Sequence, residues 1–366
     1  MISPAAKIAR VEIAAYRIPT DQLESDGTLD WDHTEIVIAI VTAGRLSGLG
    51  WSYASRAAAT LASDILCPAV VGRDALQTEQ VWQEMNRRIR NAGRPGVGSM
   101  AIASIDIALW DLKAKLLDLS LVDLFGAVRD GVAIYGSGGF TSYSETQLTE
   151  QLGGWAEAGI PRVKMKIGRD PDADPHRVKA ARKAIGADVE LFVDANGAYA
   201  QKQALALANL FAAESDVVWF EEPVSSDDLE GLNLIRDRGP AGMDIAAGEY
   251  GDTVDYFRRM VNAGAVDCLQ ADVTRCGGYT GFLKVASLCE SFHVPLSAHC
   301  APQLHAHVGC AVHSLRHVEY FHDHTRIDDL IFDGTIIQEK GILKPDRSRT
   351  GHGITLKTAD AEHFRV

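Results

Sequence analysis

The distribution of apolar residues divides the chain into an N-terminal part and a longer repeating part. Apolar and polar residues alternate up to about residue 55, and residues 9–13 and 35–41 show the period of two that is typical of β-strands. A third strand is expected after a glycine-containing turn. Residues 57–127 show helical spacing, which is strongest at 101–116. The pattern predicts an N-terminal α+β module.

From residue 132 onward, short apolar runs alternate with helical stretches. Eight such runs occur, at residues 132–135, 163–167, 191–193, 217–220, 245–247, 268–270, 295–298 and 318–321. Eight strands that alternate with helices are typical of a closed parallel barrel. An open doubly wound sheet is the alternative, but no G-x-G-x-x-G or G-x-x-x-x-G-K-S/T fingerprint is present. After residue 322 the repeat ends, and we expect the chain to pack back on the N-terminal module.

A polar, acidic segment at residues 20–31 separates the first two predicted strands. We interpret it as a long loop. Such a loop is either a lid over a binding site or a mobile connection without a specific role. Its acidic residues are Asp21, Glu24, Asp26 and Asp30. A lid of this polarity suits a substrate with hydroxyl groups better than an aromatic one.

Acidic residues lie at or just after three successive apolar runs. Asp194, Glu221 and Glu249 are 27 and 28 residues apart, the length of one β/α unit. The spacing predicts that all three reach the same end of the barrel, where carboxylate oxygens suit Mg²⁺ or Mn²⁺ rather than zinc. Solvated strand ends are the alternative. Glu222 points to the opposite side of its strand from Glu221, and the spacing does not choose between them.

Two lysines, Lys164 and Lys166, share one face of the second predicted barrel strand. Each cation disfavours charge on the other, so we expect a lowered pKa and a neutral amine that can act as a base. An exposed edge strand with two solvated lysines is the alternative.

A second acid/base group is predicted from the sixth and seventh runs. Asp272 follows the sixth run and His299 ends the seventh, so the carboxylate can accept the Nδ1–H of the histidine and raise its basicity. Glu319, in the eighth run, could present a carboxylic acid to a substrate oxygen or serve as an ion-pair partner. Asp106 and Asp111, on the apolar helix at 101–116, are interpreted as structural hydrogen-bond partners because they lie outside the repeat.

The composition narrows the classes of function. Hydrophobic residues make up 46% and charged residues 23%, which is ordinary for a globular enzyme. The net charge of −13 argues against nucleic acid and anionic membranes as partners. Six cysteines form no C-x-x-C pair and are expected to be reduced core thiols. No signal-like leader or long apolar run is present, so a cytoplasmic location is expected.

Taken together, the ordered motifs resemble the enolase superfamily and, within it, the mandelate racemase subgroup (the mandelate racemase/muconate lactonizing enzyme family). The motifs that carry the resemblance are Lys164-x-Lys166, Asp194-Ala-Asn196, Glu221-Glu222-Pro223, Gly248-Glu249, Asp272-x-x-Arg275-x-Gly277-Gly278, Ser297-Ala298-His299 and Glu319. They span most of the chain. Arg275 stands where the racemase itself has a lysine, and here the chain resembles the acid-sugar dehydratases of the group.

The resemblance implies an α/β fold, a modified TIM barrel (β/α)7β at residues 129–339. An N-terminal α+β capping domain would occupy residues 1–128, with residues 340–366 packing back on it. The superfamily places one Mg²⁺, or Mn²⁺, per subunit on three carboxylates, which correspond to Asp194, Glu221 and Glu249. This choice resolves the ambiguity between Glu221 and Glu222.

The resemblance also implies roles for the other motif residues. Lys166, tuned by Lys164, and the Asp272–His299 dyad would be bases on opposite faces of the substrate. Glu319 would hydrogen-bond the substrate carboxylate. The remaining candidate substrate-binding residues are Asn196 and, in two loops that would close over the site, Trp31 and Tyr53.

The implied chemistry is Mg²⁺-dependent abstraction of the proton α to a carboxylate, through an enediolate. Because residues 20–31 are polar, we favour dehydration of a sugar acid, an aldonate or aldarate, to a 2-keto-3-deoxy acid. The alternatives are a racemase or epimerase of a 2-hydroxy acid or amino-acid derivative, and a cycloisomerase of an anhydro-sugar acid or lactone. A non-catalytic barrel that binds a metal or a sugar acid is more remote. The expected partners are a small-molecule carboxylate and further copies of the same chain.

Overall fold

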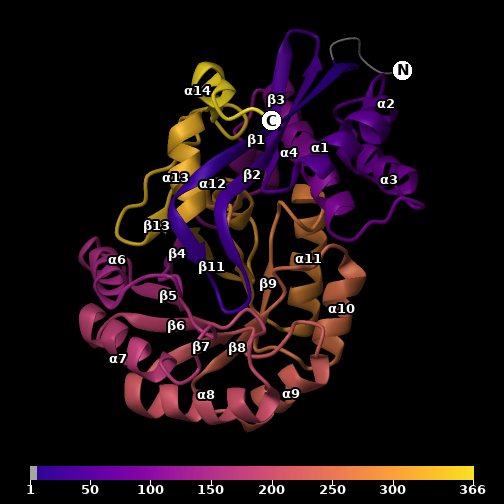
Figure 1. Ribbon diagram of the computed structural model, residues 1–366. Coiled ribbons are helices and arrows are strands. Elements are labelled where there is room, and N and C mark those ends of the chain that lie inside the picture. Colours follow the sequence, from indigo (N-terminus) through magenta and orange to yellow (C-terminus); the bar gives the residue numbers. More distant parts are fainter. Residues whose placement is uncertain (1–5) are drawn as a thin grey trace.

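The computed structural model describes residues 6–366, and its N-terminal part is a three-stranded antiparallel sheet covered by helices (Figure 1). The sheet order is β1 (Ile8–Ser25), β2 (Asp30–Ala43) and β3 (Leu46–Ser52). The helices are α1 (Arg56–Leu61), a π-helical segment (Ala62–Leu66), α2 (Cys67–Val70), α3 (Thr78–Arg88), α4 (Val97–Leu116) and α5 (Leu121–Phe125). The predicted α+β module is therefore confirmed.

Helix α4 lies directly on β3 because two glycines leave room for it. A Cβ atom at Gly48 would lie 2.0 Å from the carbonyl oxygen of Ala108, and one at Gly50 would lie 2.3 Å from the amide nitrogen of the same residue. No side chain larger than hydrogen fits at either position without moving the helix backbone. This close packing fixes the first sheet on the apolar helix.

The second part of the chain is a closed parallel barrel. Its eight strands are β4 (Val132–Gly138), β5 (Arg162–Lys166), β6 (Glu190–Asp194), β7 (Val217–Glu221), β8 (Asp244–Ala247), β9 (Cys268–Ala271), β10 (Leu296–Ala298) and β11 (Leu315–Phe321). Neighbouring strands pair in parallel, and β11 pairs with β4 to close the ring. Each strand overlaps one of the eight predicted apolar runs, because strands buried on both faces read as continuous apolar segments.

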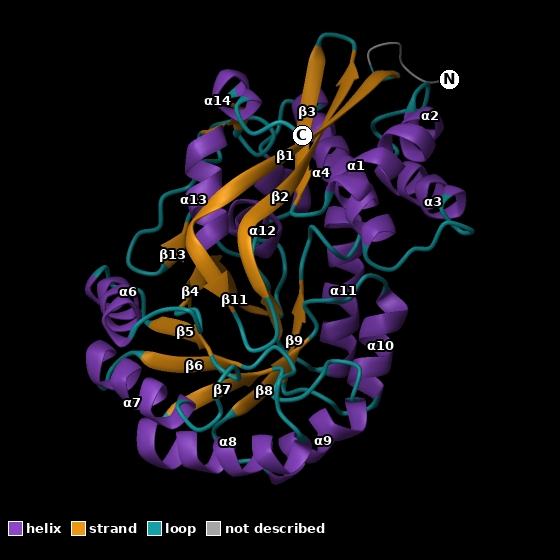
Figure 2. Ribbon diagram, viewed as in Figure 1, coloured by secondary structure: helices purple, strands orange, loops and turns teal. Residues whose placement is uncertain are grey.

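Helices connect the barrel strands and cover their outer side (Figure 2). They are α6 (Glu145–Glu157), α7 (Asp174–Ile185), α8 (Gln201–Ser215), α9 (Leu229–Arg238), α10 (Val254–Asn262), α11 (Gly278–Phe292) and α12 (Pro302–Gly309). A short strand, β13 (Ile342–Leu343), adds to β4 in the antiparallel direction. Because the eight strands are parallel, the loops that follow them lie at one end of the barrel.

The interpretation of residues 20–31 as a loop is wrong. These residues complete a long hairpin in which β1 pairs with β2 as far as Ser25 and Asp30, and only residues 26–29 turn. Asp26 forms the turn by accepting the amide N–H of Leu29 at 2.7 Å. The strand ends lacked an apolar alternation because one side faces solvent and the other faces a polar cavity.

The tip of this hairpin sits on the barrel. A Cβ atom at Gly27 would lie 2.5 Å from the carbonyl oxygen of Ala195 and 2.8 Å from that of Ile167. These two residues directly follow β6 and β5. The hairpin therefore covers the end of the barrel at which the acidic residues were predicted.

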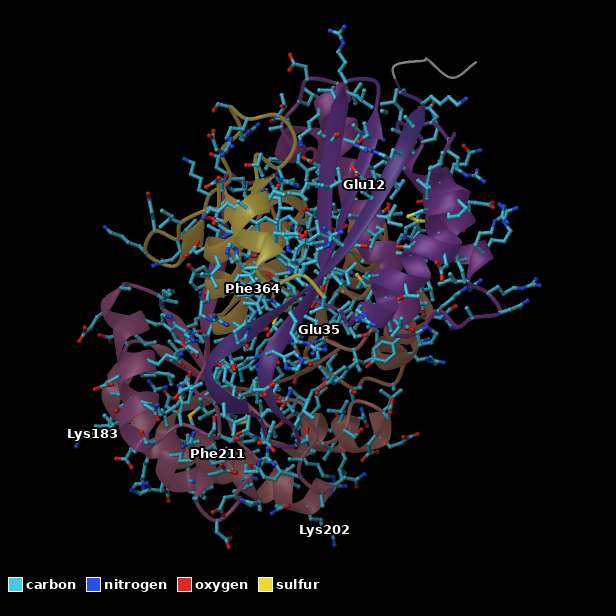
Figure 3. The ribbon with its side chains drawn as sticks, turned by 45° about the horizontal axis from the view of Figure 1, so that its top comes forward. Glu12, Glu35, Lys183, Lys202, Phe211 and Phe364 are labelled. Atoms are coloured by element: carbon cyan, nitrogen blue, oxygen red, sulfur yellow. The ribbon has the colours of Figure 1, made fainter. Side chains whose placement is uncertain are left out.

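The C-terminal residues return to the first sheet. After α13 (His322–Ile331), two short strands, β12 (Phe332–Asp333) and β14 (Thr355–Leu356), pair with each other, and α14 (Thr358–Glu362) follows. The amide of Arg17 donates to the carbonyl of Phe364 at 2.8 Å, and that of Val366 donates to Ala15 at 3.0 Å. Phe364 is labelled in Figure 3, near the strands of this sheet. Across residues 6–366, every helix falls short of the length and apolar character needed to cross a membrane.

Candidate active site

Three carboxylates converge at the end of the barrel under the hairpin. Asp194 ends β6, Glu221 ends β7, and Glu249 follows β8 after Gly248, whose φ of +134° turns the chain. One oxygen from each carboxylate lies within 4.8 Å of the other two, and all three side chains are buried. The structure thus brings the predicted trio together with Glu221. Glu222, which has a φ of +39°, is buried outside this group.

Both lysines point into the same space from β5. Lys166 Nζ lies 2.5 Å from Asp194 Oδ2. Lys164, which is fully buried, lies 2.8 Å from Glu319 Oε1 and also contacts Glu221. The alternative of solvated lysines on an edge strand is therefore wrong.

The expected lowering of the lysine pKa values is not observed in this arrangement. Burial lowers the pKa of Lys166 most strongly, but the carboxylates of Asp194, Glu249 and Glu221 together outweigh burial and leave the pKa above its ordinary value. Burial likewise lowers the pKa of Lys164, but nearby groups, chiefly the carboxylates of Glu221 and Glu319, together outweigh burial. The pKa of Lys164 therefore lies well above its ordinary value. The repulsion between the two ammonium groups can be read from the sequence, whereas the carboxylates opposite them come from other strands.

The histidine–aspartate dyad is present on the other side of the trio. His299 Nδ1 lies 2.9 Å from Asp272 Oδ2, and its Nε2 lies 3.3 Å from Glu249 Oε2. The amide and the hydroxyl of Thr274 both donate to Asp272 Oδ1 at 2.7 Å, which fixes the carboxylate. Burial raises the pKa of Asp272, but the hydrogen bond and charge of His299, together with Arg275, bring it down to about 2. Asp272 is thus ionised and orients the imidazole with Nε2 toward the cavity.

Glu319, in β11, is held by donors on both oxygens. Ser137 Oγ donates to Oε1 at 2.6 Å, and the amide of Cys300 donates to Oε2 at 3.0 Å. Cys300 Sγ also lies 3.3 Å from His299 Nε2. Cys300, expected from the sequence to be only a core thiol, thus lies within the site. Its place directly after His299 in the sequence was the one feature that could have indicated a position in the site.

The charges in this cluster fit a divalent cation. Five buried carboxylates surround the centre and face three lysine and arginine side chains, so that acidic groups are in excess. The carboxylates are those of Asp194, Glu221, Glu249, Asp272 and Glu319, and the cations are Lys164, Lys166 and Arg275. Burial, followed by the charge of Asp194, raises the pKa of Glu221 to about 8. A hard 2+ ion would balance this excess, and three oxygen donors suit Mg²⁺ or Mn²⁺.

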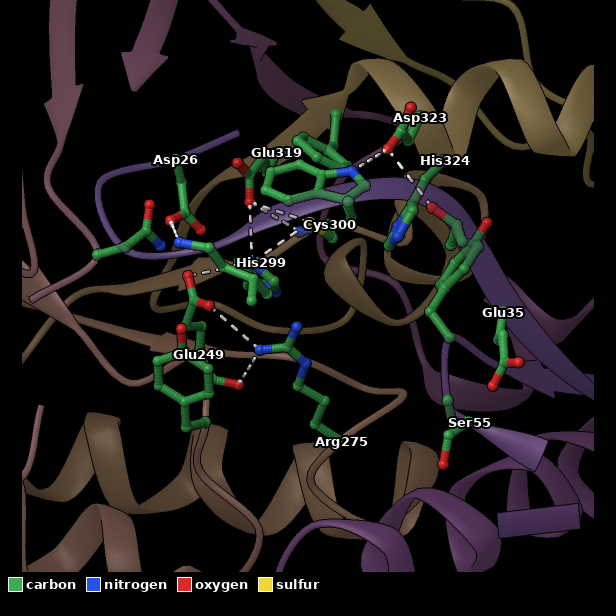
Figure 4. A pocket seen from close by; sticks show the side chains of 18 of the residues that line it. Asp26, Glu35, Ser55, Glu249, Arg275, His299, Cys300, Glu319, Asp323 and His324 are labelled. Atoms are coloured by element: carbon green, nitrogen blue, oxygen red, sulfur yellow. Dashed lines mark hydrogen bonds and ion pairs between the residues drawn. The ribbon is translucent and has the colours of Figure 1, made fainter. Parts of the chain in front are cut away.

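A cavity of about 400 Å³ separates this cluster from the hairpin (Figure 4). Lys166, Asn196, Glu249, His299 and Glu319 line its barrel side. Trp31 and Tyr53, both predicted, line its other side. Several further residues, not predicted from the sequence, reach the cavity from separate elements. These are Glu35, Tyr250, Asp323 and His324.

The two predicted lid residues are anchored to the barrel. The indole N–H of Trp31 donates to Glu24 at 2.9 Å and to Asp323 at 3.2 Å. Tyr53 Oη donates to Asp328 at 2.7 Å, and its ring stacks on His324. The hairpin and the segment after β3 are therefore closed over the site.

The residues that were interpreted as structural have structural partners. Asp106 accepts the amide and hydroxyl hydrogens of Thr280 at 2.9 and 2.7 Å. Asp111 accepts the amides of Leu49 and His352 at 2.8 and 2.9 Å. All six cysteines are free thiols, and five of them are buried. None of the six forms a disulfide, as the composition predicted.

Comparison with known families identifies the fold. Residues 147–361 match the family described as "Enolase C-terminal domain-like", and residues 27–126 match the "Mandelate racemase / muconate lactonizing enzyme, N-terminal domain". The chain belongs to the enolase superfamily. Within it, the chain is a member of the mandelate racemase/muconate lactonizing enzyme family, which confirms the predicted fold class.

Three relatives show the range of this similarity. The chain is 34% identical over 358 residues to 3,6-anhydro-alpha-L-galactonate cycloisomerase of Streptomyces coelicolor, covering 95% of this chain and 97% of that protein. It is 54% identical, with a TM-score of 0.96, to a mandelate racemase/muconate lactonizing enzyme-like protein from Rubrobacter xylanophilus, covering 98% and 100% of the two chains. It is 32% identical, with a TM-score of 0.89, to L-talarate dehydratase from Polaromonas sp. JS666 complexed with Mg and L-glucarate, covering 98% and 97%. The predicted magnesium cofactor agrees with the metal in that complex.

Proposed function

We propose that this superfamily member abstracts the proton α to the carboxylate of a sugar acid and expels the β-hydroxyl, giving a 2-keto-3-deoxy acid. One observation carries the proposal. Lys166 and the His299–Asp272 dyad reach a single cavity from different strands, with the carboxylate trio between them. Two proton-transfer groups beside one metal-ligand set suit the removal of a proton and the loss of a leaving group.

The metal site in this proposal consists of Asp194, Glu221 and Glu249. Magnesium on these oxygens supplies the positive charge that stabilises the negative charge developing on the substrate carboxylate. The buried Lys164 lies between Glu221 and Glu319 and adds a fixed positive charge beside the same position. Glu319, hydrogen-bonded by Ser137, faces the substrate oxygens from β11.

Proton transfer is assigned to Lys166 and His299. One of them, in its neutral form, takes the α-proton, according to the configuration at that carbon, and the C–H electron pair becomes the double bond of an enediolate. The neutral form of Lys166 requires that Asp194, once it binds magnesium, no longer holds the ammonium group. His299 Nε2 then gives a proton to the β-oxygen as its C–O bond breaks, so that the group leaves as water. The resulting enol gains a proton at carbon and becomes the 2-keto acid. Asp272 keeps the imidazole in the required tautomer throughout.

Cycloisomerisation of an anhydro-sugar acid is the second candidate. The relative named a 3,6-anhydro-alpha-L-galactonate cycloisomerase covers nearly the whole chain and supports it. The same residues would remove the α-proton, but the leaving oxygen would be the ring ether, which stays in the product. A dehydratase product is lighter by one water, whereas a cycloisomerase product keeps the mass of its substrate.

Proton NMR in D₂O with Mg²⁺ tests the proposal on a panel of aldonates, aldarates and anhydro-aldonates. New 2-keto-3-deoxy signals from an aldonate or aldarate, which reaches that product only by losing water, support the dehydratase. The same signals from an anhydro-aldonate, which reaches that product without a change of mass, support the cycloisomerase. Exchange of the α-proton without a new skeleton would overturn both in favour of a racemase or epimerase. With an accepted substrate, Lys166→Ala and His299→Asn should each lower turnover by about 10²- to 10⁴-fold.

Two exposed residues provide matched controls for these variants. Lys202 lies in α8 on the outside of the barrel (Figure 3), and His293 lies at the end of α11. His293 has a φ of +57°, which asparagine tolerates well. Lys202→Ala and His293→Asn should retain wild-type turnover. If Lys166→Ala and His299→Asn also retain it, the two-base mechanism is wrong.

A further inference from the structure

The cavity has two ends of different chemical character. Its near end holds Lys166, Glu249 and His299. Its far end is formed by the hairpin, the segment after β3 and the start of α13, and Figure 4 shows Glu35 and Ser55 on the side away from Glu249. A sugar acid whose carboxylate lies at the metal-ligand trio therefore directs its other terminus toward the far end.

The far end carries carboxylates. Glu35 lines the cavity and accepts two hydrogen bonds from Arg17, at 2.7 and 3.0 Å, and one from the amide of Arg56 at 2.9 Å. Asp323 is buried, accepts the indole N–H of Trp31 at 3.2 Å, and has no hydrogen-bond partner at Oδ1. Both groups can accept hydrogen bonds from hydroxyl groups.

The lysine and arginine side chains that line the cavity lie at the near end, whereas on the hairpin side the cavity is lined by one histidine, His33, whose Nδ1 lies 2.5 Å from Asp32. Lys166 and Arg275 are the lysine and arginine side chains among the described residues that line the cavity. Lys166 pairs with Asp194, and Arg275 lies 3.2 Å from Glu249 Oε1. At the far end, burial lowers the pKa of His324 to about 3, so that this imidazole is neutral. Arg17 is not among the lining residues, and its guanidinium group pairs with Glu35 at 2.7 Å.

Building on the α-proton chemistry proposed above, we infer that the substrate has a single carboxylate. It is an aldonate or an anhydro-aldonate whose uncharged, hydroxylated terminus faces Glu35 and Asp323. A diacid would place a second carboxylate against these acidic groups, where no lysine or arginine among the described lining residues can pair with it and the nearby His33 already pairs with Asp32. Hydroxyl groups at the same position donate hydrogen bonds instead. The dehydratase from Polaromonas sp. JS666 was solved with glucarate, a diacid, so this chain would differ from that relative in specificity.

Matched pairs of acids that differ only at the terminal carbon test the inference. Galactonate and galactarate, and gluconate and glucarate, present the same stereocentres with a terminal hydroxymethyl group or a carboxylate. In the wild type, kcat/KM for the monoacid should exceed that for the diacid by about 100-fold. A diacid that is turned over equally well or better would overturn the inference.

Two variants shift the charge at the far end. Glu35→Gln removes a lining carboxylate and leaves Arg17 without its ionic partner, and Ser55→Lys adds an ammonium group at the same side. Each should lower the monoacid-to-diacid ratio by about tenfold. Glu12→Gln is the matched control, because Glu12 lies on β1 away from the cavity and pairs with the exposed Arg10 (Figure 3). A ratio that is unchanged in both far-end variants would also count against the inference.

Binding separates this inference from the proposed function. If no acid in the panel reacts, the dehydratase and cycloisomerase assignments fail, and calorimetry with Mg²⁺ then decides the inference. The probes are a pentonohydroxamate and the corresponding pentarohydroxamate, which carries a second carboxylate. Tighter binding of the first supports a monoacid site, and equal or tighter binding of the second contradicts it.

Discussion

Replacement of Gly27 by alanine tests whether the hairpin must seat on the barrel for catalysis. Gly27 lies in the turn between β1 and β2, and its φ is in a range that alanine can adopt, so the change adds only one methyl group. That methyl group would lie 2.5 Å from the carbonyl oxygen of Ala195 and 2.8 Å from that of Ile167. These atoms belong to the backbone directly after Asp194 and Lys166, and they cannot rotate away.

The size of the effect follows from the distance. An ordinary contact requires about 3.4 Å, so the hairpin tip must retreat by about 0.9 Å from the strand ends, or the strand ends must shift. Misplacement of reacting groups by about 1 Å costs about 10²-fold in rate. We therefore expect kcat/KM of Gly27→Ala to fall about 10²-fold, which corresponds to about 2.7 kcal/mol of transition-state stabilisation.

The assay is steady-state kinetics on the substrate identified by NMR, together with urea unfolding of the same samples. Gly154→Ala is the control, because Gly154 lies in α6 with open space at its Cβ position. This control should keep wild-type kcat/KM and gain up to about 1 kcal/mol of stability from helix propensity. If Gly27→Ala keeps wild-type kcat/KM, the seated hairpin is not required for the chemistry and the reasoning is refuted.

Three further predictions concern single carboxylates. Glu221→Gln should weaken Mn²⁺ binding by about tenfold or more, measured by calorimetry, because even changes outside the ligand set typically cost 10–100-fold. Asp272→Asn should lower kcat by at least about 10²-fold without loss of fold by circular dichroism, because it no longer holds the tautomer of His299. Burial raises the pKa of Asp106 from 3.8 to about 7, so the folded state retains a proton between these values that the unfolded state releases. The free energy of unfolding should therefore fall by about 4 kcal/mol as the pH rises through this window, and urea unfolding of Asp106→Asn, which can still hydrogen-bond Thr280, should lack this slope.

The barrel could be predicted from the sequence because its strands are buried on both faces. Continuous apolar runs such as residues 163–167 and 217–220 stand out against the amphipathic helices between them. The carboxylates Asp194 and Glu221 also stand out, because burying a charged residue at the end of an apolar run costs free energy unless the charge has partners. Periodicity therefore located both the strands and the end of the barrel that carries chemistry.

The hairpin could not be predicted in the same way. The ends of β1 and β2 contact a polar cavity on one side and solvent on the other, so residues 20–31 carry the composition of a loop although they are largely extended. Glu35 and Asp323 become neighbours of the site only through this hairpin and α13, and no local signal connects them. The lysine pKa values were misjudged because they depend on Asp194, Glu221 and Glu319, which come from three other strands.

Backbone conformation shows how the fold aims these side chains. Four non-glycine residues within three positions of the ends of β6, β7 and β10 have positive φ: Asn196 at +46°, Glu222 at +39°, Cys300 at +50° and Ala301 at +41°. Such conformations cost about 1–3 kcal/mol each and persist only where the surroundings enforce them. At these positions the chain leaves the barrel abruptly, so Asp194 and Glu221 stay at the ends of their strands and His299 stays directly after β10 while the next residues turn aside. The strain thus lies beside the residues of the proposed mechanism, where a looser turn would move the carboxylates and the imidazole apart.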